Sequence, residues 1–171
     1  MSFRRGIVLV LACAAIAASI PAATHAAGGG GDEPRRAAPG KPEDPDYGAG
    51  VKAIKAGSFA QAIPLLEGVV ARDAANADAY NWLAYAIRRN GDPARALPLY
   101  EKALALDPKH RGAHEYIGEA YLALDNPAKA REHLTRLDSL CFFSCEEYRD
   151  LKKAIEAYEK SRGKVKPAAV R

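Results

Sequence analysis

The sequence predicts an all-α fold, an α-solenoid of three helix pairs closed by a C-terminal capping helix. Three parts of the chain align without a gap at a period of 34 residues, which is typical of stacked helical units. The same region lacks the alternation of apolar and polar residues that indicates strands. We expect a folded domain over residues 46–160, with repeats at about 43–76, 77–110 and 111–144 and a capping helix at 145–160.

The aligned columns hold the same physical kind of residue in each repeat. The matching segments are "GSFAQAIPLLEGVVARDAAN" (57–76), "GDPARALPLYEKALALDPKH" (91–110) and "DNPAKAREHLTRLDSLCFFS" (125–144). Ala62, Ala96 and Ala130 fall in one column, where small side chains let two helices approach closely. A second column holds large residues that fill the space between pairs: Leu66, Tyr100 and Leu134. The columns therefore predict close-packed helices.

Helix-start signals divide each repeat into two helices. N-cap residues precede the second helix of every pair: Ser58, Asp92 and Asn126. Pro93 and Pro127 follow at the first helical position, where a missing N–H costs nothing. In the first repeat, Ser58 and Gln61 have the spacing of a capping box.

The N-terminus has the features of a secretory signal peptide. Arg4 and Arg5 precede an apolar run over residues 6–20, and small residues follow up to Ala26. The run is shorter than the roughly 20 residues that a membrane-spanning helix needs. We expect cleavage of residues 1–26 and a periplasmic or secreted protein, with no membrane span after cleavage.

A lipoprotein is the alternative reading of this leader. "VLAC" at residues 10–13 loosely resembles a lipoprotein box, which would make Cys13 a lipidated N-terminus. The apolar run, however, continues for seven residues beyond Cys13, and the hydrophobic region before it is very short. These lengths favour cleaved export.

Cleavage changes what the composition implies. Loss of Arg4 and Arg5 brings the net charge of +4 close to neutral, so the basic pI of 9.0 is no argument for a nucleic-acid partner. Residues 27–45 are rich in Gly and Pro and lack apolar periodicity, which predicts a disordered linker. We also expect a disordered basic tail over residues 161–171.

The repeat resembles the tetratricopeptide repeat family. The resemblance rests on the 34-residue period, on a small residue at position eight of each repeat (Gly50, Ala84 and Gly118) and on Pro108, which closes the middle repeat. The outer repeats depart from the pattern, with Asp46 in place of an aromatic residue and Phe142 in place of the terminal Pro. The family implies a right-handed superhelix whose concave face, lined by the first helix of each repeat, holds a peptide or partner protein.

The resemblance also implies which residues would face a partner. The main candidates are Tyr47, Val51, Ile54, Asp78, Asn81, Tyr85, Arg88, Glu115, Glu119 and Leu122. Asp44 and Gly112 fall on the same face. Tyr47 and Tyr85 are the expected anchors, because Tyr offers a large contact area with few torsions to freeze. The alternative is that this face is an ordinary solvated helix surface.

One class of partner is disfavoured. Family members that bind the C-terminal tails of chaperones carry a carboxylate clamp of Lys, Asn and Arg. The matching positions here hold Tyr47, Val51, Trp82, Gly112 and Tyr116. The clamp is absent, so the sequence argues against that partner class.

We expect neither an enzyme nor a cofactor or metal protein. His110 and His114 have the i,i+4 spacing of a metal pair, but His110 falls in a turn and no third ligand is evident. No nucleophile has a positioned base, and no Gly-rich phosphate loop follows a strand.

The capping helix follows a short connection with two phenylalanines. Ser144 and Glu147 have capping-box spacing, which predicts the helix start. We expect at least one of Phe142 and Phe143 to pack under the new helix. This ending resembles small exported bacterial repeat proteins that share a Cys-Phe-Phe-x-Cys-Glu-Glu-Tyr segment.

Cys141 and Cys145 flank this connection and have several possible roles. Two cysteines in an exported chain favour a structural disulfide, whose five-residue loop would stabilise the fold by roughly 2 kcal/mol. A copper(I) site, a redox-active pair and two free thiols remain as alternatives.

Two functions follow from the sequence. The first is a non-enzymatic interaction module of the bacterial cell envelope that binds a partner protein or peptide on the concave face. The second is a metal-handling or redox accessory protein that uses Cys141 and Cys145.

Overall fold

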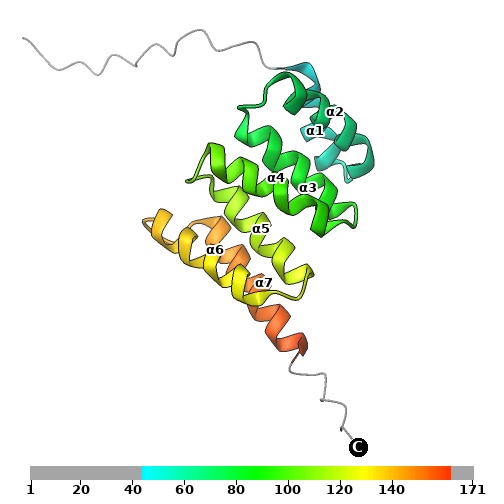
Figure 1. The fold of residues 1–171 in the computed structure, drawn as a ribbon. Coiled ribbons are helices and arrows are strands. Elements are labelled where there is room, and N and C mark those ends of the chain that lie inside the picture. Colours follow the sequence, from blue (N-terminus) through cyan, green and yellow to red (C-terminus); the bar gives the residue numbers. More distant parts are fainter. Residues whose placement is uncertain (1–43, 163–171) are drawn as a thin grey trace, which may run out of the picture. The chain divides into compact units, whose positions relative to one another are not determined.

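The computed structural model describes residues 44–162, and this part of the chain contains seven helices and no strand (Figure 1). The helices are α1 (Pro45–Lys55), α2 (Phe59–Arg72), α3 (Ala77–Arg89), α4 (Pro93–Leu106), α5 (Arg111–Ala123), α6 (Pro127–Leu140) and α7 (Glu146–Arg162). The predicted all-α repeat fold is confirmed. The predicted signal peptide with Cys13, almost all of the linker, and the tail from residue 163 lie outside the described residues.

The helices pack as three consecutive pairs. The most extensive contacts are within the pairs α1/α2, α3/α4 and α5/α6, and each pair meets the next through α2 with α3 and α4 with α5. α7 lies against both α5 and α6, where a further repeat would continue the stack (Figure 1). Among the described residues, no helix combines the length and the apolar character needed to cross a membrane.

All three residues predicted as N-caps occupy that position, and two of them also cap with their side chains. The side chains of Asp92 and Asn126 accept hydrogen bonds from the first turns of α4 and α6, and a proline occupies the first position of each helix. The capping box predicted at Ser58 is wrong, because the Ser58 side chain makes no capping hydrogen bond. Its backbone carbonyl oxygen, and not its hydroxyl, accepts a hydrogen bond from the Gln61 N–H at 3.0 Å.

The turns inside the pairs need a left-handed backbone. Gly57 and Gly91 have φ values of 74° and 103°, which glycine adopts without a steric cost. Asp125 occupies the same turn in the third repeat with φ 62°, and Asp is among the few other residues that tolerate this region. The left-handed backbone of this turn therefore explains why the aligned column holds Gly57, Gly91 and Asp125.

Small residues set the closest helix approaches. Ala62, Ala96 and Ala130 are all completely buried, as the alignment predicts. At Gly118 of α5, an added Cβ would stand 2.7 Å from two methyl carbons of Leu151 in α7. The absence of a side chain at Gly118 therefore lets α7 lie directly on α5.

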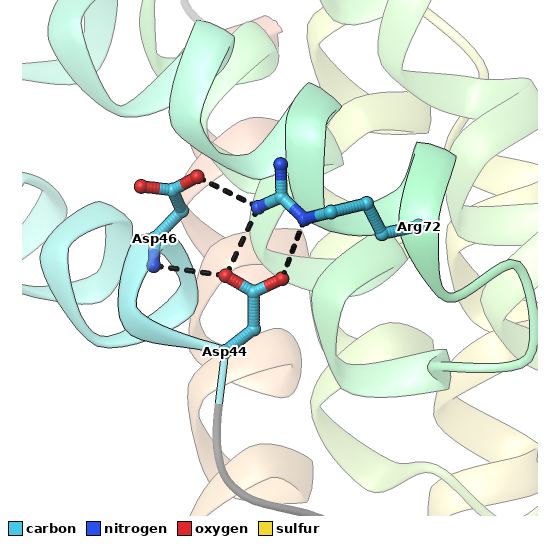
Figure 2. Close-up of polar contacts among 3 residues, drawn as sticks. All are labelled: Asp44, Asp46 and Arg72. Carbon is cyan, nitrogen blue, oxygen red and sulfur yellow. Dashed lines mark hydrogen bonds and ion pairs between the residues drawn. The ribbon is translucent and has the colours of Figure 1, made fainter.

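An arginine ties the first helix to the second. The Arg72 guanidinium, at the end of α2, donates to both carboxylate oxygens of Asp44 at 2.8 and 2.9 Å and to Asp46 at 2.7 Å (Figure 2). Asp44 also caps α1 by accepting from the Asp46 N–H at 3.0 Å. Asp44 thus has a structural role in the helix start.

The connection to α7 differs from its prediction. Phe142 and Phe143 are 92% and 86% exposed, so the expectation that one packs under α7 is wrong. The inner face of α7 instead packs through its own Leu151 and Ile155 against Leu137 of α6 and Leu122 of α5. Ser144 has a left-handed φ of 36°, and α7 starts at Glu146, so Cys145 precedes the helix and Ser144 is not its N-cap. At its other end, α7 continues to Arg162, into the predicted tail.

Candidate functional site

The first helices of neighbouring pairs meet along a line that we call the α3/α5 seam. Three levels of paired residues form it, spaced by about one helical turn: Asn81 beside Gly112, Tyr85 beside Tyr116, and Arg88 beside Glu119. A Cβ added at Gly112 would stand 3.6 Å from the Asn81 Nδ2, which shows how close the two residues lie. The ring centroids of Tyr85 and Tyr116 are 4.7 Å apart, and Arg88 and Glu119 form an ion pair of 2.6 Å. Asn81, Tyr85 and Arg88, three α3 residues of the predicted partner-binding face, therefore all lie toward α5.

An aromatic cluster occupies the middle of the seam. Tyr85 lies 6.2 Å from Phe59, 5.7 Å from Trp82 and 4.7 Å from Tyr116, measured between ring centroids. All four rings are only partly buried against the core. Such rings offer a large contact area that needs little ordering, as binding surfaces require.

Arg88 links this cluster to the charged end of the seam. Its guanidinium pairs with Glu119 at 2.6 Å and lies 5.3 Å from the ring centroid of Tyr85 and 5.7 Å from that of Tyr116. Its Nε also donates to the hydroxyl of the buried Tyr100 at 3.4 Å. The Arg88 side chain is thus fixed from three directions, and its charge is already neutralised by Glu119.

Two buried polar groups of the seam have unused acceptor atoms. Asn81 is 3% exposed, and its Oδ1 has no hydrogen-bond partner. Glu115 is 8% exposed, and its carboxyl group has no hydrogen bond or ion pair within the described part of the chain. A buried polar atom left unpaired costs about 1–3 kcal/mol, so such groups need a functional explanation.

The surroundings of Glu115 favour its neutral form. Burial raises the pKa of its carboxyl group to about 8, and the negative charges of Glu119, Asp150 and Glu147 act in the same direction. Arg88 opposes this change only weakly. The result is an acidic end of the seam, formed by α5 together with α7, in which Glu115 has no cation of its own.

The remaining open candidates lie at the edges of this face. Tyr47 and Val51 of α1 are half-buried, and Tyr47 packs on the same core as the aromatic cluster. Asp78 is exposed, and one carboxylate oxygen lies 3.1 Å from the His110 Nε2 without the alignment of a hydrogen bond. These residues extend the face from α1 across the start of α3.

Four candidates are not on an open face. Ile54 and Leu122 belong to the hydrophobic core, so the expectation that they face a partner is corrected. They share a repeat position with Arg88, but an aliphatic side chain at that position folds inward, and α6 and α7 cover Leu122. Asn81 and Glu115 are also buried, although their polar atoms border the seam.

Several residues of this face were missed in the sequence. Trp82 and Tyr116 are 34 positions apart, so the repeat alignment could have placed them together. Glu147 and Asp150 act on Glu115 from α7, which no repeat column covers. His133 also escaped the sequence analysis: its Nδ1 lies 3.0 Å from the Nδ1 of His114.

The sulfur atoms of Cys141 and Cys145 are paired in the structure, with their Cα atoms 5.5 Å apart. Cys141 ends α6 and Cys145 precedes α7. Within residues 44–162, no group of three or more His, Cys, Asp or Glu side chains could hold a metal ion. A disulfide in the exported protein stays a prediction.

Comparison with family models gives two matches that together span most of the described residues. Both are described as tetratricopeptide repeat, and they match residues 47–109 and 88–155. A comparison with curated proteins found no match.

Solved structures with this fold include proteins of different kinds. MamA 41-end from Desulfovibrio magneticus RS-1 is 30% identical over 56% of this chain and 54% of its own, with a TM-score of 0.54. The first TPR of Spaghetti (RPAP3) bound to HSP90 peptide SRMEEVD is 24% identical over 67% and 90% of the two chains, with a TM-score of 0.60. The type III secretion translocator chaperone SycD of Yersinia enterocolitica is 16% identical over 68% and 91%, with a TM-score of 0.60. The chain spans about half the length of MamA, and the other two likenesses show the fold.

Proposed function

Because the chain belongs to the tetratricopeptide repeat family, we propose that it is a protein–protein interaction scaffold of the bacterial cell envelope. In this proposal, a segment of a partner protein binds across the first helices α1, α3 and α5. The observation that carries the proposal is the aromatic cluster, whose rings Phe59, Trp82, Tyr85 and Tyr116 remain partly exposed at this face. Aromatic anchors of this kind dominate the binding energy of many interfaces.

The character of the face argues for a partner unlike an acidic chaperone tail. The RPAP3 domain is solved with the peptide SRMEEVD, whose last four residues carry three carboxylate side chains. Here the α5 end of the face contains the carboxyl groups of Glu115 and Glu119, with Glu147 and Asp150 close by. These carboxyl groups would repel an acidic partner segment at this end of the face.

The envelope location rests on the predicted signal peptide, and the paired cysteines agree with an oxidising compartment. The alternative function would need Cys141 and Cys145 as free thiolates. Their pairing in the structure favours a role in pinning the turn between α6 and α7.

Site-specific photocrosslinking of the exported full-length chain tests the proposal. A photoreactive phenylalanine replaces Tyr85 on the first-helix face, and in a control replaces Glu101, an exposed residue of α4. We expect one main envelope protein to be joined at position 85 and not at 101, with chain recovered from the periplasm starting near Ala27. Equal crosslinking at both positions, or crosslinking at neither, would contradict the proposal.

A further inference from the structure

Asn81 and Glu115 are two buried residues of the seam whose side chains can accept hydrogen bonds. The Asn81 Oδ1 is a buried atom without a partner, and no hydrogen bond or ion pair joins the Glu115 carboxyl group to the rest of the described chain. The Asn81 amide lies against Gly112, and Glu115 follows Gly112 by three residues on the same side of α5. Both acceptors therefore border the same stretch of the seam. Neither has a role in helix capping or helix pairing that would explain its burial.

The groups around this stretch are suited to a cation. Glu119, Glu147 and Asp150 place negative charge near Glu115. The neighbouring cations are already engaged, because Arg88 pairs with Glu119 at 2.6 Å and Arg111 pairs with Glu147 at 3.6 Å. The rings of Tyr85 and Tyr116 lie one level along the seam and already accept one guanidinium near their faces. Aromatic faces and carboxylates together bind ammonium and guanidinium groups.

We propose that the α3/α5 seam binds a lysine or arginine side chain of the partner, with its charged group between Asn81 and Glu115 and its aliphatic stem on the tyrosine rings. This inference rests on the proposed function and names the partner segment as basic and extended. The Asn81 Oδ1 and the Glu115 carboxylate accept its N–H groups. An apolar or acidic side chain would leave both acceptors unpaired, because it brings no N–H or O–H donor.

Binding would be coupled to a proton. The free protein holds Glu115 largely neutral at pH 7, since burial and the three neighbouring carboxylates raise its pKa to about 8. A bound cation favours the carboxylate, so one proton leaves Glu115 when the basic side chain enters. Affinity should therefore increase as the pH rises from 6 toward 8, by about tenfold per pH unit where Glu115 is mostly neutral.

The test uses the full-length exported protein and octapeptide pools fixed at one position as Lys, Arg, norleucine or Glu. Trp82 is the chain's one tryptophan and lies in the aromatic cluster, so its fluorescence reports binding. We expect the Lys and Arg pools to bind at least tenfold more tightly than the other two. Titration calorimetry in two buffers of different ionisation enthalpy should show about one proton released at pH 7.

Glu115→Gln should lower the affinity for the basic pools by at least tenfold and abolish both the proton release and the pH dependence. Glu156→Gln, which neutralises an exposed carboxylate of α7, is the matched control and should change neither the affinity nor the proton release.

Misfolding would not explain a loss of affinity in Glu115→Gln. A raised folded pKa makes Glu115 stabilising below pH 4.5, its unfolded value, and this contribution is lost as the pH rises to about 8. Gln mimics the neutral acid, so Glu115→Gln should melt no lower than wild type at pH 8.

Two results would overturn the inference. One is equal binding of the norleucine and lysine pools, and the other is unchanged binding of the basic pools by Glu115→Gln. The proposed function has a separate outcome. In that outcome, the partner is still crosslinked at position 85 in Glu115→Gln, with the same yield at pH 6 and pH 8. This result would support the scaffold function and contradict the binding of a basic side chain by the seam.

Discussion

Ala96→Trp should abolish the cooperative melt of the protein or lower its melting temperature strongly. Ala96 is completely buried where α4 meets its neighbours, and it shares its repeat position with the equally buried Ala62 and Ala130. Overpacking a core usually costs about 1–3 kcal/mol, and an indole placed where only a methyl group fits should exceed that range. Circular dichroism at rising temperature measures the effect.

Ala94→Trp provides the matched control, because Ala94 is exposed two residues earlier in the same helix. It should melt within a few degrees of wild type, since surface substitutions usually change stability by less than about 0.5 kcal/mol. If Ala96→Trp and Ala94→Trp melt alike, the helix register described here is wrong.

Gly118→Leu should separate the capping helix α7 from α5. A Cβ at position 118 would already stand 2.7 Å from the Leu151 methyl carbons, and Leu151 is completely buried. We expect a loss of at least about 1–3 kcal/mol in the free energy of unfolding. Amide hydrogen exchange should show faster exchange across α7 than across α3.

Gly48→Leu makes the same chemical change where there is room. A Cβ at Gly48 of α1 meets nothing within 4 Å, and a glycine inside a helix is destabilising by roughly 0.5–1 kcal/mol relative to alanine. This variant should therefore be as stable as wild type or slightly more stable. A destabilised Gly48→Leu, or normal protection of α7 in Gly118→Leu, would show that the contact with Leu151 does not hold the cap.

The repeat fold could be predicted from the sequence because each repeated residue type serves a local structural role. Asp92 and Asn126 cap their helices, Gly57 and Gly91 form left-handed turns, and buried alanines recur at one position. The connection before α7 was not predictable in the same way. The path of Phe142 and Phe143 depends on the left-handed Ser144 and on a core that other helices have already filled.

The site shows where repeat alignment stops being informative. It correctly placed Tyr85, Arg88 and Glu119 on one face, because equivalent positions of neighbouring repeats lie side by side. It did not reveal that Asn81 and Glu115 are buried, or that α7 brings Glu147 and Asp150 toward Glu115. The charges around Glu115 depend on α7, a helix outside the repeat. A buried carboxyl group with a raised pKa destabilises the fold at neutral pH, and a binding site can explain why it is retained.

The affinity of the crosslinked envelope partner for Tyr85→Ala, compared with its affinity for Tyr80→Ala, shows whether the aromatic cluster binds the partner. Both tyrosines belong to α3 and are half-buried, but Tyr80 lines a pocket of about 510 Å³ among α2, α3 and α4, away from Tyr116. Removing a buried aromatic anchor commonly costs 2 kcal/mol or more, about thirtyfold in affinity. We expect that loss for Tyr85→Ala and nearly wild-type binding for Tyr80→Ala and for Cys141→Ser with Cys145→Ser. Binding that survives Tyr85→Ala but is lost in the double cysteine variant would contradict the scaffold and make the cysteine pair the working site.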